Sequence, residues 1–205
     1  MSQLADPPPG LRERKKIQLR QAVQREALRL FAAQGYDQTT VEQITAAAQT
    51  STSTFYRYFP TKEDAVLDDD YDPLAEQTIA GRPAGEPLLT TVRAALAAVV
   101  AAVEADREQN LTRLRLKAAI PALTARQAVE GRKTFDLIAR VVAARTGRSI
   151  QDYQLRLAAA ALTAAQSEAS RYWADHDGTD DLAELMDQAV TAVGPLLTAL
   201  DPCAG

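Results

Sequence analysis

The residues of this chain whose types and spacing most clearly indicate a chemical role are a run of hydroxyl side chains, about a quarter of the way along it. They are Thr52, Ser53, Thr54 and Tyr56. Mostly short hydroxyls let a helix approach a DNA groove closely and bond to phosphates or base edges. Phe55 and Phe59, four residues apart, share the opposite side of that helix and can dock on a small core. The pattern predicts a helix with a groove-facing side and a packed side.

Longer polar side chains follow this run. Arg57, Tyr58 and Lys62 have the reach for phosphates, and Lys62 also stands where we expect a helix N-terminus, whose free N–H groups attract phosphate. The basic segment Leu11–Lys16, which contains Arg12, can lie along phosphates as an arm. A solvated tail explains that segment equally well.

Signals for catalysis are weak. The single histidine, His176, is in a helix-end loop, and the single cysteine, Cys203, is far from it, so they form no Cys/His metal cluster. A glycine-rich phosphate loop is absent. The acids Asp68–Asp70 with Asp72 can bind a cation, but a solvated acidic turn explains them better. We therefore expect no enzyme, no cofactor and no metal site.

Charge is distributed unevenly along the chain. Residues 1–62 hold nine Lys or Arg against five Asp or Glu, whereas residues 63–205 hold 14 bases against 22 acids. A basic end on an acidic body indicates a polyanion partner for that end only, although random surface charge is the alternative.

Composition favours helices throughout. Apolar residues make up 46% of the 205 residues, aromatics only 5%, and alanine is abundant. Segments with β-branched, period-2 alternation are absent, so we expect an all-α fold of about nine helices. The longest apolar run, Ala94–Val103, is about half of a membrane span, and the N-terminus lacks an apolar signal region. These features predict a cytoplasmic protein without a membrane partner.

Caps and breakers divide the N-terminal part into short helices. Gly35 is suited to end the first helix, Thr39 with Glu42 forms a capping box for the second, and Ser51 caps the third. Thr61 caps a fourth, with a break expected near Pro73. The expected helices span about 12–34, 41–48, 52–59 and 62 onward, then 87–108, 109–119, 121–146, 151–175 and 179–200.

This N-terminal pattern resembles the TetR family of bacterial transcriptional regulators. The matching residues are Val23, Ala27, Leu28, Leu30, Phe31, Gly35, Tyr36, Thr39, Thr40, Val41 and Ile44, then Ser51, Thr54–Phe59, Lys62 and Glu63. The resemblance implies a helix-turn-helix DNA-binding domain at 11–62 and a helical ligand-binding and dimerisation domain at 63–205. The prolines at 7–9 predict a disordered arm at 1–10 before them. The resemblance also implies a homodimer on a palindromic operator in double-stranded DNA. Such proteins are usually repressors released by a small molecule.

Two departures from the family stand in the DNA-binding segment. Gln49 occupies a turn position that is commonly glycine, and a left-handed Gln49 would cost about 1 kcal/mol or more. Thr52 and Ser53 replace a longer basic residue or a glycine, which predicts light base-edge contact. The candidate DNA-binding residues are Arg12, Thr39, Thr40, Ser51, Thr52, Ser53, Thr54, Tyr56, Arg57, Tyr58 and Lys62.

A weaker second resemblance concerns the segment from Phe59 to Pro73. It is similar to an actinobacterial TetR subgroup whose C-terminal domain is described as binding acyl-CoA-like ligands, which makes this class a candidate effector. Apolar stripes among many alanines leave room for a ligand, although each stripe residue is also explained by plain core packing. The candidate ligand-binding residues are Leu96, Val99, Val103, Leu114, Phe135, Ile138, Gln166 and Trp173.

Basic residues of the C-terminal part can neutralise an anionic ligand. Arg113, Arg115 and Arg171 are the candidates, with surface solvation the alternative for each. The last two helices carry small residues that suit a two-fold interface between subunits, unless they complete the monomer core. The candidate dimer residues are Leu155, Leu162, Leu185, Met186, Val193 and Leu197.

The sequence thus predicts a homodimeric, ligand-responsive repressor. The alternatives of the same fold are an activator and a regulator without a small-molecule effector.

Overall fold

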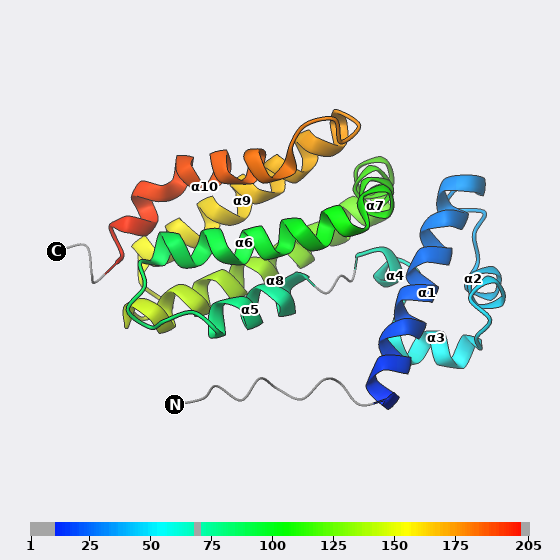
Figure 1. Ribbon diagram of the computed structural model, residues 1–205. Helices are drawn as coiled ribbons and strands as arrows, with labels where there is room; N and C mark the ends of the chain where they lie inside the picture. The colour runs from blue at the N-terminus through cyan, green and yellow to red at the C-terminus, as the bar shows by residue number, and fades with distance from the viewer. Residues whose placement is uncertain (1–10, 68–70, 202–205) are drawn as a thin grey trace. The chain divides into compact units, whose positions relative to one another are not determined.

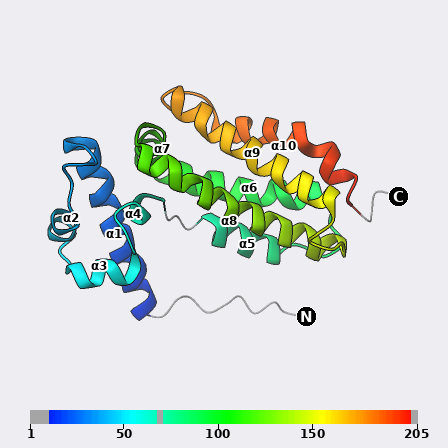
Figure 2. The ribbon, with the colours of Figure 1, turned by 180° about the vertical axis from the view of Figure 1, so that it is seen from behind.

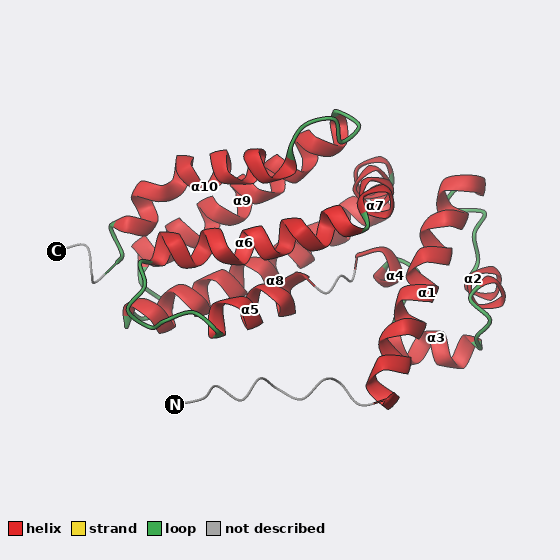
Figure 3. Ribbon diagram, in the orientation of Figure 1, coloured by secondary structure: helices red, strands yellow, loops and turns green. Residues whose placement is uncertain are grey.

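The computed structural model describes residues 11–67 and 71–201. The side chains of 11–13 and 127–130 lie outside this description, as do the expected arm at 1–10, Asp68–Asp70 and Cys203. Every regular element among the described residues is an α-helix (Figure 3), which confirms the all-α prediction. The chain divides into two compact units, Met1–Asp68 (unit 1) and Asp69–Gly205 (unit 2).

Unit 1 is built on one long helix. Its helices are α1 (Leu11–Gln34), α2 (Val41–Ala47), α3 (Thr52–Tyr58) and α4 (Asp64–Leu67) (Figure 1). Helix α1 contacts α2 and α4, and α2 contacts α3. The buried core residues are Val23, Ala27, Leu28, Phe31, Ile44, Phe55, Phe59, Ala65, Val66 and Leu67. Three phenylalanines therefore fix short helices that would be unstable alone.

Helix α2 begins at Val41 as predicted, but its N-cap is one residue later than predicted. Thr40, not Thr39, is the N-cap: its hydroxyl accepts from the Gln43 N–H at 3.3 Å, and the Gln43 side chain accepts from the Thr40 N–H at 2.9 Å. Thr39 is instead buried under the loop. The capping-box prediction was correct in kind but wrong in register.

The turn between α2 and α3 has the strain that the sequence suggested. Gln49 has φ 51°, in the left-handed region that favours glycine. The Thr50 N–H donates to the Thr45 carbonyl at 2.9 Å and closes the end of α2. This left-handed residue turns the chain sharply into α3.

Unit 2 is a helical bundle. Its helices are α5 (Tyr71–Ala80), α6 (Leu88–Ala105), α7 (Arg107–Ala119), α8 (Pro121–Thr146), α9 (Tyr153–Asp175) and α10 (Leu182–Thr198). Helices α6, α8, α9 and α10 run side by side in both views, and α7 crosses at one end (Figures 1 and 2). Helix α9 packs on α8 and α10, α10 also packs on α6, and α5 packs on α6 and α8.

Three helices of unit 2 contain a proline: Pro73 is in α5, Pro121 begins α8 and Pro195 is in α10. Pro73 is in the first turn of α5, where a missing N–H costs nothing. The break predicted near Pro73 is present, because α4 ends at Leu67 and a separate helix, α5, begins at Tyr71. Because α5 starts at Tyr71 as a separate helix, the described residues form ten helices rather than about nine. Pro195 lies inside α10, which continues to Thr198.

The core of unit 2 has two separate clusters. One joins α6, α8, α9 and α10 and is centred on Leu88, Val142, Leu155, Leu162 and Leu197 (cluster A). The other joins α6, α7, α9 and α10 around Trp173 and includes Val100, Ala169, Leu182 and Met186 (cluster B). By length and composition α6 can cross a membrane, a test that core helices also pass; it buries Leu88 and Val92 in cluster A.

Candidate nucleic-acid interface and effector unit

Helix α3 is fixed at its start by its own cap. The Ser51 hydroxyl accepts from the Thr54 N–H at 3.1 Å and lies 2.9 Å from the Thr54 hydroxyl. Ser53 has its hydroxyl 3.4 Å from that of Ser51. The cap therefore places three hydroxyls together at the exposed N-terminus of α3.

The inner side of α3 is held by aromatic packing. Phe55 and Phe59 are both 0% exposed, and their ring centroids lie 5.5 Å apart. Ile44 of α2 and Phe31 of α1 are buried in the same unit. Burial of both rings on one side of α3 fixes which of its residues face outward.

The outer side of α3 is polar and open. Tyr56 is 53% exposed, and Ser53 and Arg57 are exposed beside it. The Arg57 guanidinium lies over the Tyr58 ring, 4.9 Å from its centroid, and is thereby oriented along the helix surface. Thr52, Thr54 and Tyr58 are half-buried. An exposed tyrosine and arginine beside short hydroxyls can bond to phosphates and base edges.

Thr39 and Thr40 have different environments despite being neighbours. Thr39 is 1% exposed, and its hydroxyl donates to the Gly35 carbonyl at 2.7 Å. The prediction of a DNA contact at Thr39 was therefore wrong, because its hydroxyl is buried under the loop before α2. Thr40 is exposed at the start of α2. Arg12 belongs to α1, but its side chain lies outside the described residues.

Lys62 makes contacts that the sequence did not predict. Its ammonium donates to the carbonyls of Tyr36 at 2.9 Å and Thr39 at 3.3 Å, and lies 3.8 Å from the Tyr36 ring centroid. These contacts engage the ammonium inside unit 1, where it ties the loop before α2 to the start of α4. Lys62 thus has a structural role inside unit 1, and its phosphate contact stays a prediction.

Glu63 completes this internal network by accepting a hydrogen bond from the Tyr36 hydroxyl. Burial by itself raises the pKa of Glu63. The bonds from Tyr36 and Thr61, with the nearby Lys62 charge, outweigh burial and hold the pKa below its ordinary value. The carboxylate is thus charged when it pairs with the loop.

The candidate ligand residues of unit 2 are divided between the two core clusters. Leu96, Phe135 and Ile138 pack against cluster A. Val103, Leu114 and Trp173 belong to cluster B. Val99 and Gln166 are half-buried on α6 and α9. The structure therefore does not gather the eight residues into one site.

Trp173 is a core residue. It is 0% exposed, its indole N–H donates to the Asp180 carbonyl at 3.1 Å, and the Arg107 guanidinium lies 5.1 Å from its ring. A ligand contact at Trp173 was the wrong prediction, because the ring is covered on all sides by the chain itself.

Three of the candidate dimer residues are also internal. Leu155, Leu162 and Leu197 are at most 1% exposed and lie in cluster A. The prediction was wrong for these residues because a side chain already covered by α6 and α8 has no surface for a second subunit. Met186 is buried in cluster B, whereas Leu185 and Val193 are half-buried.

The opposite face of α9 is open and apolar. Tyr153 is 74% and Leu157 is 42% exposed, and Ala160 and Ala164 continue the same face at helical spacing. A row of exposed apolar residues is a candidate interaction surface. Sequence reasoning named α9 for the dimer interface but chose residues on its buried side.

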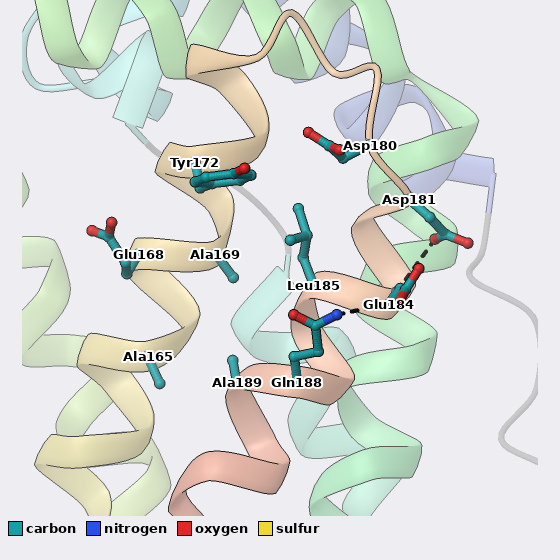
Figure 4. A pocket seen from close by; sticks show the side chains of 10 residues that line it. All are labelled: Ala165, Glu168, Ala169, Tyr172, Asp180, Asp181, Glu184, Leu185, Gln188 and Ala189. Atoms are coloured by element: carbon teal, nitrogen blue, oxygen red, sulfur yellow. Dashed lines mark hydrogen bonds between the residues drawn. The ribbon is translucent and has the colours of Figure 1, made fainter.

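A groove of about 590 Å³ lies beside this face, between α9 and α10. Figure 4 shows Glu168 and Tyr172 on the α9 side and Leu185 and Gln188 on the α10 side. The small residues lining it are Ala165, Ala169 and Ala189. Its remaining residues are Asp180, Asp181 and Glu184. The acidic mouth disfavours an anionic ligand here.

A buried polar cluster in unit 2 joins α5 to α7. Asn110 Oδ1 accepts from the Tyr71 hydroxyl and from Arg113 Nη1, both at 2.8 Å. Asn110 and Arg113 are 4% and 6% exposed. Sequence analysis named Arg113 but missed Tyr71 and Asn110. The spacing of Asn110 and Arg113, three apart beside Leu114, was the available signal.

The other basic candidates are on the surface. Arg115 is exposed and pairs with Asp177 at 2.6 Å, and Arg171 pairs with Glu168 and Asp175. Within the described ranges, no group of three His, Cys, Asp or Glu could hold a metal ion.

Two family models match the chain. The model described as "Bacterial regulatory proteins, tetR family" matches residues 25–67, and the one described as "MftR C-terminal domain" matches residues 86–198. The chain belongs to the TetR family. It is a transcriptional regulator of that family, with the helix-turn-helix in unit 1 and the family's ligand-binding domain in unit 2.

A curated relative extends this match along the chain. The HTH-type transcriptional regulator TcmR of Streptomyces glaucescens is 34% identical over 203 residues, covering 93% of this TetR-family chain and 89% of that protein. Relatives and family are regulators rather than enzymes.

Solved structures show the same fold. FadR of Thermus thermophilus, a TetR-family repressor in complex with lauroyl-CoA, has a TM-score of 0.59 at 24% identity, covering 85% of this chain and 92% of that one. FadR of Bacillus subtilis in complex with stearoyl-CoA has a TM-score of 0.58 at 17% identity, covering 87% and 97%.

Proposed function

We propose that this regulator is a cytoplasmic homodimeric repressor that binds a palindromic operator through two copies of α3. The observation that carries the proposal is the division of α3 into a buried side and an exposed side. Phe55 and Phe59 are fully buried, while Ser53, Tyr56 and Arg57 are exposed. The residues proposed to touch DNA are Thr40, Ser51, Thr52, Ser53, Thr54, Tyr56, Arg57 and Tyr58.

Each exposed residue of α3 has a distinct expected role. Tyr56 can contact base edges or methyl groups, because its side chain is 53% exposed. Arg57 contacts phosphate, since stacking on Tyr58 pre-orients its guanidinium. Short hydroxyls at the N-terminus of α3 allow the close approach that these two contacts need.

Two subunits associate through the exposed side of α9 and the neighbouring groove. Tyr153, Leu157, Ala160 and Ala164 provide an apolar row, and the alanines of the groove permit close helix approach. A dimer is required to place two α3 helices in successive major grooves.

A small molecule bound in unit 2 releases the operator. The two FadR structures hold acyl-CoA ligands, which makes acyl-CoA-like compounds the first class to test. The ligand must bind the DNA-incompetent state more tightly by a few kcal/mol to shift the population.

The first experiment measures operator binding. Fluorescence anisotropy with the intergenic DNA beside the protein's own gene is compared at several salt concentrations. We expect Tyr56→Ala to reduce specific affinity by tenfold or more, at about 1–3 kcal/mol per good base contact. Arg57→Ala should lower the slope of log affinity against log salt concentration by about one.

Arg29→Ala is the matched control for Arg57. It removes the same charge from α1, where Arg29 is paired with Glu26 at 2.8 Å. Equal effects of the two variants, or unchanged affinity in Tyr56→Ala, would show that α3 is not the recognition helix.

The dimer is tested by light scattering after size exclusion. Leu157→Arg should give monomers, because a charge would be buried at the centre of the apolar row. Ala144→Arg places the same side chain at an exposed position of α8 and should stay dimeric. A dimeric Leu157→Arg would exclude this face.

A further inference from the structure

Among the residues that the structure describes, Arg113 is a buried charge without a counter-charge. It is 6% exposed, and its guanidinium makes one hydrogen bond, from Nη1 to Asn110 Oδ1. Its Nε is buried without a partner. Among the described residues, no carboxylate lies in ion-pair range of it. An unpaired guanidinium is costly to bury, so packing alone does not explain an arginine at this position.

The surrounding cluster cannot supply the missing acceptor. Asn110 Oδ1 has two lone pairs, and these accept from Arg113 and from the Tyr71 hydroxyl. Asn110 Nδ2 donates to the Val103 carbonyl at 3.0 Å, which fixes the amide. Asn110 therefore orients the guanidinium while leaving its Nε without an acceptor.

Two other arginines show what this cluster lacks. Arg145 also has a buried unpartnered Nε, but its Nη2 donates to the Pro83 carbonyl at 2.6 Å and its charge helps to lower the pKa of Glu86. Arg115, two residues along α7, is exposed and paired with Asp177. Arg113 is 6% exposed and has no carboxylate in ion-pair range within the described part of the chain.

We propose that Arg113 is the anion-recognition residue of the effector site, and that the effector is an apolar molecule with a compact oxyanion. This inference rests on the proposed ligand response and names its chemistry. Leu111, Leu114 and Val103 pack against cluster B along the helices that carry the Arg113 cluster, which suits an apolar body. A carboxylate, sulfonate or phosphate oxygen supplies the acceptor that Nε lacks.

The same cluster provides a route for regulation. Tyr71 is the first residue of α5 and follows unit 1 by three residues in sequence. Because Tyr71 and Arg113 share Asn110 Oδ1, an anion that draws the guanidinium away changes the bond that holds the start of α5. Ligand binding at Arg113 is thereby coupled to the segment that connects the two units.

The test uses two dyes that differ only in the anion. 8-Anilinonaphthalene-1-sulfonate carries a sulfonate, and N-phenyl-1-naphthylamine has the same rings without it. Fluorescence titrations of the full-length protein compare wild type with Arg113→Met. We expect the variant to lose about tenfold or more in sulfonate-dye affinity, the scale of a buried charge-assisted bond. Affinity for the neutral dye should stay within about twofold.

Arg115→Met is the matched control, since it removes an arginine from the exposed side of α7. It should leave both dyes unaffected. Failure of the wild type to bind the sulfonate dye, or equal losses for both dyes in Arg113→Met, overturns the proposal.

Thermal unfolding separates a binding role from a structural one. Asn110 keeps its bond from Tyr71 when Arg113 is removed, so Arg113→Met should raise the unfolding midpoint by about 2–4 °C for each kcal/mol gained. A lower midpoint would make Arg113 a structural residue and refute the assignment.

Displacement of the neutral dye identifies the source of the oxyanion. Laurate, lauroyl-CoA and 1-dodecanol are compared on wild type and Arg113→Met. If the variant binds laurate more weakly than the wild type does, the oxyanion is a ligand carboxylate. If only the binding of lauroyl-CoA is weaker, the oxyanion is a phosphate. Equal displacement by all three compounds in both proteins contradicts the proposal.

Coupling is measured by operator release. Tyr71→Phe should bind the sulfonate dye within about twofold of wild type but require more laurate to release DNA. If the protein binds its operator but the dye tests fail, the repressor function is retained and only the anion-recognition role of Arg113 is rejected. Loss of operator binding, with the difference between the two dyes intact, would reject the repressor function and retain Arg113 as the anion-recognition residue.

Discussion

The two units of this regulator reach their functions in different ways. Unit 1 depends on neighbours in sequence: the Ser51 cap and two buried phenylalanines orient one seven-residue helix. Unit 2 depends on which side each of several long, alanine-rich helices buries. The same helix, α9, has Leu155 in the core and Leu157 in the open. A small, locally specified unit therefore depends on few residues, whereas a large one distributes its stability.

The substitution with the largest expected effect is at Phe55, and it tests whether unit 1 depends on few residues. Phe55→Ala removes a fully buried ring from a small core and should cost about 3–5 kcal/mol. We expect operator binding to vanish while much of the helical circular dichroism, which comes from unit 2, remains. Leu162→Ala is the comparison in unit 2 and should leave operator binding measurable. Simultaneous loss of both units would contradict their independence.

A smaller effect is expected at Gly178, which precedes α10. Its φ is 68°, and a Cβ would lie 2.8 Å from Leu111 Cδ1. Gly178→Ala should therefore cost about 2–3 kcal/mol from backbone strain and overpacking. Differential scanning calorimetry should detect it. Gly85→Ala, where a Cβ meets nothing within 4 Å, is the control; equal losses would reject the clash.

Lys62 tests whether a basic side chain of unit 1 has a structural role or contacts DNA. Lys62→Met keeps the aliphatic stem but removes the ammonium that bonds to Tyr36 and Thr39. Stability should fall by about 1.5–3 kcal/mol. In salt titrations the operator-binding slope should change less than in Arg57→Ala. If Lys62→Met changes the salt dependence of operator binding by a full unit and leaves stability unchanged, Lys62 contacts phosphate.

The smallest expected effect has the opposite sign. Gln49→Gly relieves the left-handed backbone at φ 51° and should stabilise unit 1 by up to about 1 kcal/mol. Urea unfolding followed by a unit 1 signal measures it. Gln38→Gly, in the preceding loop, controls for added flexibility. Destabilisation by Gln49→Gly would mean that its side chain supports the turn.

Prediction from sequence succeeded where spacing is local. The side of α3 that buries Phe55 follows from positions within a few residues of each other. The left-handed Gln49 is indicated by the family resemblance, in which glycine is common at that turn position. Prediction failed where two neighbouring residues compete for one role. Thr39 and Thr40 both suit a cap, and only the Gly35 carbonyl, which takes the Thr39 hydroxyl, decides between them. Lys62 likewise meets carbonyls from a loop 23 to 26 residues earlier.

The sequence by itself determined the helical fold, the basic N-terminal unit and the family resemblance, because caps, helical periodicity and local aromatic spacing act over one or two turns. Only the tertiary structure decided that Leu155 and Trp173 are internal, that the open face of α9 carries Tyr153 and Leu157, and that Arg113 is buried while Arg115 is not. In an alanine-rich helix each side can serve as core, and the choice is made by contacts with helices distant in sequence.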